Sequence, residues 1–145
     1  MKYLPLLGFL SAFVFASFAG VTIVVRSGEQ VARYIWRPLL VCKQPLYDLG
    51  ELKKGESRSH DFIIENNGTR DLRITSVTPG CKSCIEVVKY TTISIAPGES
   101  GTVRLRFLSK LLDEGEASKA AVVKSNDPNN PFFLLRFRAN VRDDS

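Results

Sequence analysis

The residues that could do chemistry in this chain are three cysteines and a single histidine, His60. Cys81 and Cys84 form a C-x-x-C motif directly after a Pro-Gly pair, while Cys42 stands apart. Residues i and i+3 of a β-turn lie within about 7 Å at Cα, and a disulfide needs roughly 4.4–6.8 Å. Cys81 and Cys84 are therefore predicted to bridge across a turn or to remain ordinary thiols.

Two more specific functions, a redox site and a metal site, would use the same cysteines. A thioredoxin-like redox site needs its first cysteine at a helix N-terminus, where the dipole lowers the thiol pKa. The strand-like run Ile85–Val88 that follows Cys84 argues against such a helix. A metal site would need Cys42, Cys81, Cys84 and His60 as a Cys₃His set, although only one pair has ligand spacing. Both stay open as alternatives, and we expect no bound cofactor.

No catalytic constellation accompanies these residues. His60 alternates with Phe62 in a strand-like run, where a lone histidine more often packs or faces solvent than acts as a general base. The sequence contains no Gly-x-Ser-x-Gly, P-loop, Gly-x-Gly-x-x-Gly or His-Glu-x-x-His motif. We therefore predict a protein that is not an enzyme and has no catalytic residues.

The distribution of charge argues against a nucleic-acid partner. The formal net charge is +5, but residues 1–41 carry four basic residues against one acidic residue, Glu29. The remainder carries 16 basic and 14 acidic residues, with both signs interspersed. A nucleic-acid-binding domain usually has a basic stripe of its own, whereas cations beside an apolar segment can meet anionic lipid headgroups.

The N-terminal part of the chain predicts a membrane segment. Residues 4–25 carry no charge and would span roughly 33 Å as a helix, against a hydrocarbon core of about 30 Å. We therefore expect residues 1–26 to form a single-pass signal anchor that holds the protein at the cell membrane. The alternative is a signal peptide cleaved after Ser17-Phe18-Ala19, which would release a secreted protein.

Residues 27–44 are predicted to form a juxtamembrane stalk. Ser27 suits the N-cap of a short helix that Pro38 would end, and Tyr34 and Trp36 lie beside arginines as in an interfacial aromatic belt. More arginines follow the apolar segment than precede it. A strict positive-inside count would keep the following domain in the cytoplasm.

From Cys42 onward the apolar residues alternate with polar ones. Every second residue is apolar in 101–107 and in 133–141, which predicts half-buried strands. Further strands are predicted at Leu46–Leu52, Ser57–Glu65, Leu72–Thr78, Ile85–Val88, Thr91–Ile95 and Ala117–Ser125.

Turn residues separate these strands at short intervals. Asn66-Asn67-Gly68 suits a positive φ and a hairpin-like reversal, and Pro97–Ser100 and Asn126–Pro131 are equally strong breakers. Residues 45–142 are therefore predicted to form an all-β, antiparallel β-sandwich of about seven strands.

The order of the short motifs carries a family resemblance. The motifs are Tyr47–Leu52, His60-Asp61-Phe62, Asn66-Asn67-Gly68, Leu72-Arg73-Ile74, Ile95–Glu99 and Ser125–Pro128. In this order they resemble the bacterial domain of unknown function 1573 (DUF1573), an immunoglobulin-like module similar to the ASH and major-sperm-protein sandwiches. The resemblance implies that fold and an extracytoplasmic setting, against the positive-inside count, and it implies no reaction. The family's usual Cys-Gly-Cys-Thr is here Cys81-Lys82-Ser83-Cys84.

These features together predict a membrane-anchored, non-enzymatic interaction or scaffold module of the cell envelope. We expect it to bind a protein or an envelope polymer through sandwich-end loops or an exposed sheet edge. The loop Ser109–Glu116 and the turn Cys81–Cys84 are the predicted contact regions, since loops on rigid scaffolds carry recognition. The alternative is a thiol-redox or metal-handling protein centred on Cys81 and Cys84.

Overall fold

The computed structural model describes residues 15–18, 21–24, 36–92 and 94–143. The chain divides into two compact units, Met1–Ile35 and Trp36–Ser145. In the first unit, β1 (Phe15–Phe18) pairs antiparallel with β2 (Val21–Val24). In the described part of the chain, no helix is both long and apolar enough to cross a bilayer.

Most of the predicted membrane segment lies outside the described residues. Of residues 4–25, the structure describes only those in β1 and β2. The part of the predicted stalk before residue 36 is also outside the described ranges. The transmembrane helix therefore stays a prediction.

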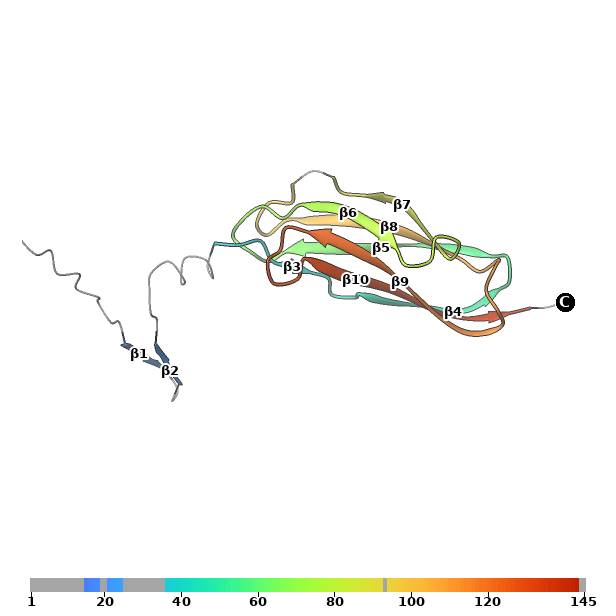
Figure 1. Ribbon diagram of the computed structural model, residues 1–145, viewed down its shortest axis with the longest axis horizontal. Coiled ribbons are helices and arrows are strands. Elements are labelled where there is room, and N and C mark those ends of the chain that lie inside the picture. Colours follow the sequence, from blue (N-terminus) through green and yellow to red (C-terminus); the bar gives the residue numbers. More distant parts are fainter. Residues whose placement is uncertain (1–14, 19–20, 25–35, 93, 144–145) are drawn as a thin grey trace, which may run out of the picture. The chain divides into compact units, whose positions relative to one another are not determined.

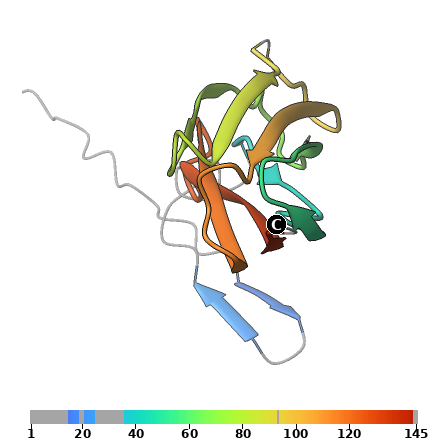
Figure 2. The ribbon, with the colours of Figure 1, turned by 90° about the vertical axis from the view of Figure 1, so that its right-hand side faces the viewer.

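The second unit is a sandwich of two four-stranded sheets (Figure 1, Figure 2). One sheet has the order β4-β10-β9-β6 and the other β3-β5-β8-β7. The strands are β3 (Leu40–Val41), β4 (Leu46–Lys53), β5 (Ser57–Asn66), β6 (Ile74–Pro79), β7 (Ile85–Tyr90), β8 (Ser100–Leu108), β9 (Gly115–Ser125) and β10 (Phe132–Arg142). The described residues contain no helix, which confirms the all-β sandwich.

Alternation along the strands builds the core between the sheets. In β8 the buried residues Val103, Leu105 and Phe107 alternate with partly exposed ones, because successive strand residues point to opposite faces. The ring of Phe137 from β10 meets the ring of Phe62 from β5 at 5.4 Å and that of Phe107 at 5.8 Å, both edge-on. Edge-to-face packing of this kind adds to the hydrophobic gain from burying each ring.

Two strand predictions need correction. The run Thr91–Ile95 is not a strand, and the fully buried Leu72 forms only an isolated bridge with Ile95 before β6 begins at Ile74. The sandwich is also not wholly antiparallel, because β4 pairs parallel with β10. A parallel pair needs a long crossover connection, and here the chain from β5 to β9 supplies it.

The sandwich begins earlier than the sequence predicted. Residues 36–44, assigned to the stalk, lie in the same compact unit as the strands. Leu40 is buried and pairs with Asn66 of β5, and its backbone N–H donates to the carboxylate of Asp127 at 2.9 Å. The apolar Leu40 therefore serves the core, and the chain then crosses to the other sheet as β4.

The turn after β5 also differs from the predicted hairpin. It leads towards β6, which lies in the opposite sheet, and Gly68 does not adopt a positive φ. A Cβ at Gly68 would overlap backbone atoms of Arg37, Pro38 and Leu39. Glycine is therefore required here by the close passage of the chain rather than by its own conformation.

Candidate functional site

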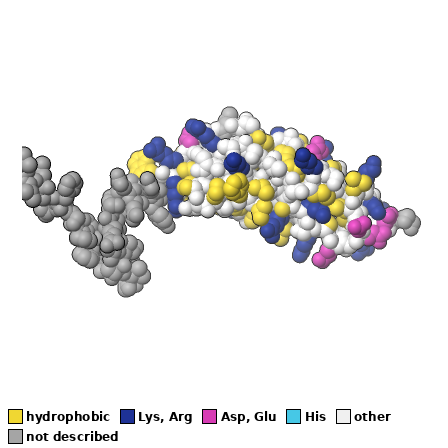
Figure 3. All heavy atoms as spheres, in the orientation of Figure 1, with side chains coloured by type: hydrophobic (Ala, Val, Ile, Leu, Met, Phe, Trp, Pro, Cys, Tyr) yellow, Lys and Arg dark blue, Asp and Glu magenta, His cyan; other side chains and the backbone are white. Residues whose placement is uncertain are grey.

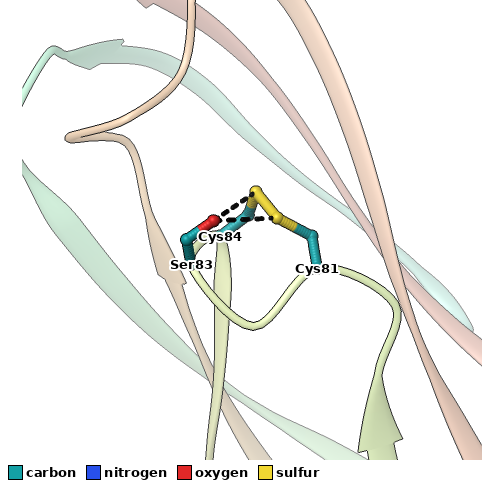
Figure 4. Close-up of a disulfide and its surroundings, with 3 residues drawn as sticks. All are labelled: Cys81, Ser83 and Cys84. Atoms are coloured by element: carbon teal, nitrogen blue, oxygen red, sulfur yellow. Dashed lines mark hydrogen bonds between the residues drawn. A yellow bond between two sulfur atoms is a disulfide. The ribbon is translucent and has the colours of Figure 1, made fainter.

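The structure joins Cys81 and Cys84 in a disulfide, with their Cα atoms 5.2 Å apart (Figure 4). The bridge closes a turn between β6 of one sheet and β7 of the other. The backbone N–H groups of Cys84 and Ile85 both donate to the carbonyl of Cys81. The disulfide therefore cross-links the turn through which the chain passes from one sheet to the other.

The surroundings of the disulfide differ from those of a redox-active thiol pair. Cys84 is buried and Cys81 is half-buried, and the hydroxyl of Ser83 lies 3.3 Å from the sulfur of Cys81. Cys84 leads directly into β7 and not into a helix. The helix N-terminus that would lower a thiol pKa is therefore not present at this turn.

The predicted Cys₃His set is not brought together. Cys81 and Cys84 are bonded to each other, whereas Cys42 and His60 line a different pocket. Among the described residues, no group of three or more His, Cys, Asp or Glu side chains has the geometry of a metal site.

His60 is a packing residue in this arrangement. Its ring stacks on Tyr47 of β4 with centroids 3.6 Å apart and meets Phe62 edge-on at 4.7 Å. Desolvation by these neighbours lowers the pKa of His60, and the carboxylate of Asp61 opposes that shift. The imidazole ring therefore packs between β4 of one sheet and β5 of the other.

A pocket lies where the chain changes sheets between β3 and β4. We call it the edge pocket; it has a volume of about 350 Å³. Its lining residues are Cys42, Lys43, Gln44, His60, Asp61, Phe62, Ile63 and Glu65. On one side β5 pairs with β8 from Ser57 to Glu65, but on the other side it pairs with β3 only at Glu65 and Asn66. In the described part of the chain, the second edge of β5 therefore has no strand partner from Ser57 to Ile64.

The charges around the edge pocket are mostly neutralised in pairs. Lys43 Nζ lies 2.7 Å from a carboxylate oxygen of Glu65. Asp61 accepts two hydrogen bonds from the guanidinium of Arg104, which lowers the pKa of Asp61. Burial raises the pKa of Cys42, as does nearby Glu65, against a lowering by a hydrogen bond from the backbone of Gln44. The pocket therefore offers a protonated thiol, an exposed Ile63 and strand backbone.

The loop predicted as a contact region is held firmly at its base. Ser109 is buried, and its hydroxyl lies within hydrogen-bonding distance of the carbonyls of Lys53 and Glu56, at 2.8 and 2.7 Å, so its one hydrogen is shared between them or donated to either. Leu111 at the tip is 71% exposed. No partner contact tests this loop or the Cys81–Cys84 turn, so both stay predictions.

Sequence reasoning missed an exposed apolar patch on the outer face of the β4-β10-β9-β6 sheet (Figure 3). Its main residues are Leu46 at 46%, Phe132 at 62% and Leu134 at 41% exposure. The signal was present in the run Phe132-Phe133-Leu134-Leu135. A continuous apolar run in a strand places large apolar side chains on both faces, and only one face of this strand is covered.

Comparisons with known proteins identify the fold and no activity. The family described as "Protein of unknown function (DUF1573)" matches residues 40–141. A Porphyromonas gingivalis W83 protein of unknown function superposes with a TM-score of 0.62 at 22% identity, covering 73% of this chain and 48% of that one. The VesB protease of Vibrio cholerae gives 0.58 at 15% identity, with coverage of 88% and 41%.

A second kind of neighbour is the ASH / PapD-like domain 7 of human CEP192, with a TM-score of 0.52 at 13% identity. It covers 73% of this chain and 87% of that domain. This chain thus spans less than half of each of the two bacterial proteins but most of the human domain. No curated protein sequence matches the chain. Likenesses at these identities show a shared β-sandwich fold and nothing about chemistry.

Proposed function

We propose that this chain, which belongs to the DUF1573 family of proteins of unknown function, is a non-enzymatic interaction module that binds a protein partner by strand addition. The observation that carries the proposal is the second edge of β5, which is unpaired from Ser57 to Ile64 beside the edge pocket. An exposed strand edge is a row of backbone donors and acceptors at the spacing of another strand.

The chemistry of the edge selects a peptide over an envelope polymer. In an extended strand every second residue directs its N–H and C=O to the same edge, and another polypeptide matches this spacing along its whole length. Ile63 lies 48% exposed at the pocket, and a partner side chain can pack against it. These features support a protein partner that contributes a short extended segment.

Membrane attachment and location form part of the same proposal. Residues 4–25 anchor the chain, and the sandwich lies on the extracytoplasmic side, in the cell envelope. The long uncharged segment supports the anchor, and the Cys81–Cys84 disulfide supports an oxidising compartment, since such bridges are rare in the cytosol. Protease added to intact spheroplasts should remove the sandwich; full protection would place it in the cytoplasm and contradict this location.

The strand-addition proposal is tested with a matched pair of substitutions in the full chain. Ile63→Lys places a charge beside the free edge of β5, and charged side chains at an edge oppose strand pairing. Val88→Lys makes the same change on β7, the opposite edge strand of the same sheet, where Val88 is similarly exposed. Loss of the apolar contact at Ile63 should weaken partner binding at least about tenfold.

Two measurements decide the outcome. Co-isolation from detergent-solubilised membranes should recover the same partner with wild type and Val88→Lys but not with Ile63→Lys, while all three chains unfold at the same temperature. Amide hydrogen exchange in β5 should slow in the isolated complex, because strand addition protects the edge amides. Equal recovery with both variants, or unchanged exchange in β5, would refute strand addition at this edge.

A further inference from the structure

The end of the sandwich that contains Trp36 carries aromatic and basic side chains together. Trp36 is 61% exposed, and the guanidinium of Arg70 lies 5.1 Å from its ring centroid. Arg37 donates to Asn129 at 2.8 Å, which ties this first segment to the turn that leads into β10. Phe132 opens β10 directly after that turn, so Trp36 and Phe132 belong to the same end of the sandwich.

The apolar patch on the outer sheet face continues from this end. Phe132 pairs with Lys124 of β9, whose ammonium lies 6.0 Å from the ring centroid. Leu134 follows two residues along β10 on the same face, because side chains alternate along a strand. We call Trp36, Arg70, Arg73, Lys124, Phe132, Leu134 and Arg136 the basic apolar surface.

The cations of this surface lack carboxylate partners, unlike most arginines of the sandwich. Within residues 36–92 and 94–143, Arg70, Arg73, Lys124 and Arg136 form no ion pair. By contrast, ion pairs engage Arg58, Arg104, Arg106, Arg138 and Arg142. The unpaired positive charge therefore gathers beside the exposed aromatic and aliphatic side chains.

The opposite end of the sandwich carries acidic side chains interspersed with basic ones. A cluster of acidic side chains lies where β10 finishes (Figure 3). Glu51 and Asp143 pair with basic side chains there, while Asp113 and Glu114 stand in the loop between β8 and β9. An anionic surface would attract the end with unpaired cations more strongly than the end where the charges nearly balance, which sets the orientation of the sandwich.

From this arrangement we propose that the basic apolar surface docks on an anionic lipid bilayer. Tryptophan and phenylalanine favour the headgroup region, and unpaired arginine and lysine side chains meet anionic headgroups there. The inference rests on the proposed membrane anchor. Between residue 25 and Trp36 the chain can reach no more than roughly 40 Å, so an anchored sandwich stays within reach of the headgroups.

The test uses the full chain reconstituted into vesicles and the fact that Trp36 is its single tryptophan. In a Trp36→Phe background, Phe132→Trp reports on the proposed docking surface. Leu111→Trp in the same background is the matched control, because Leu111 is exposed in the loop at the opposite end. Vesicles contain brominated lipid as a quencher and either phosphatidylcholine alone or a mixture with phosphatidylglycerol.

The proposal expects quenching of the tryptophan at position 132 in phosphatidylglycerol vesicles, and little quenching at position 111. A double charge reversal, Lys124→Glu with Arg136→Glu, should lower the ratio of docked to undocked sandwich at least about 25-fold, the effect of losing two cations alone. The control pair Lys82→Glu with Lys110→Glu changes the net charge equally on exposed residues outside the surface and should leave quenching unchanged.

Other outcomes overturn the inference, and flotation separates it from the anchor. If the chain floats with the vesicles but position 132 is not quenched, docking is refuted and the anchor stands. Equal quenching at positions 132 and 111, or in phosphatidylcholine alone, refutes oriented electrostatic docking. A chain that floats with neither vesicle refutes the proposed anchor and this inference together.

Discussion

Asn66 provides a sharp test of how the end of the sandwich at Trp36 is held together. Its side chain is fully buried, and its amide oxygen accepts hydrogen bonds from the N–H groups of Leu39 at 3.3 Å and Gly68 at 3.0 Å. Its amide nitrogen donates to the carbonyls of Arg70 at 2.8 Å and Ile95 at 2.9 Å. One neutral side chain thus satisfies backbone groups from three separate segments.

Asn66→Ala removes these four hydrogen bonds, and of the four backbone groups the carbonyl of Ile95 keeps the bond from the N–H of Leu72. At about 1 kcal/mol for each bond, the free energy of unfolding should fall by about 4 kcal/mol. That is a large fraction of the roughly 5–15 kcal/mol typical of a domain. Asn67→Ala is the matched control: Asn67 is exposed and bonds to Leu39 through its backbone only, so its cost should stay within about 0.5 kcal/mol.

Asn66→Asp separates shape from hydrogen bonding. An aspartate at this position keeps the acceptor oxygen but turns a second oxygen towards the carbonyls of Arg70 and Ile95. These contacts and burial favour the protonated acid, so its folded-state pKa should lie above its unfolded value of about 3.9. Stability should therefore be lost as pH rises between those two pKa values and regained as pH falls towards 4.

The measurement is urea unfolding of the detergent-solubilised full chain, followed by far-ultraviolet circular dichroism, at several pH values. The urea midpoint should fall strongly for Asn66→Ala, and for Asn66→Asp it should recover on acidification. A cost below about 1 kcal/mol for Asn66→Ala, or an Asn66→Asp variant whose deficit does not shrink at low pH, would refute the reasoning.

Three further predictions concern ionisable groups and the disulfide. Reduction of Cys81–Cys84, or the matched change to two serines, should lower the free energy of unfolding by about 2 kcal/mol in urea; unchanged stability would show that the turn does not need its clip. Cys42 should alkylate half-maximally above pH ~8.5, because burial raises the pKa of its thiol; a lower midpoint would contradict that environment. The hydrogen bonds from Arg104 lower the pKa of Asp61, so Asp61→Asn should destabilise above pH ~4, and the difference from wild type should vanish as pH falls further; a difference that persists at low pH would contradict the pairing.

Local pattern was sufficient for most of the strands. The alternation in 101–107 and 133–141 predicted β8 and β10 closely, and the observed strands extend by a residue or so at each end. It failed at Thr91–Ile95, because alternation describes which face a residue occupies and not whether a neighbouring strand is in reach. It also missed β3, whose two residues are too short to show a period.

The candidate site was less accessible to sequence reasoning. Cys42 and His60 entered the sequence analysis only as members of an alternative metal set, and the structure places both at the edge pocket, with the His60 ring stacked on Tyr47. No pattern in the sequence marks the free edge of β5, since that edge exists only because the chain leaves β3 after Val41 to join the other sheet. The continuous apolar run Phe132–Leu135 indicated the apolar patch, but whether its outer side chains are exposed depends on what covers the sheet.

The sequence by itself determined the class of fold, the positions of most strands and turns, the uncharged segment at residues 4–25, and the closeness of Cys81 and Cys84. These properties depend on residues within one strand or turn of each other. Only the tertiary structure decided that β4 pairs parallel with β10, that β5 keeps a free edge, and that Gly68 has no room for a side chain. Each of those outcomes depends on which distant segment lies alongside, and local periodicity carries no information about that partner.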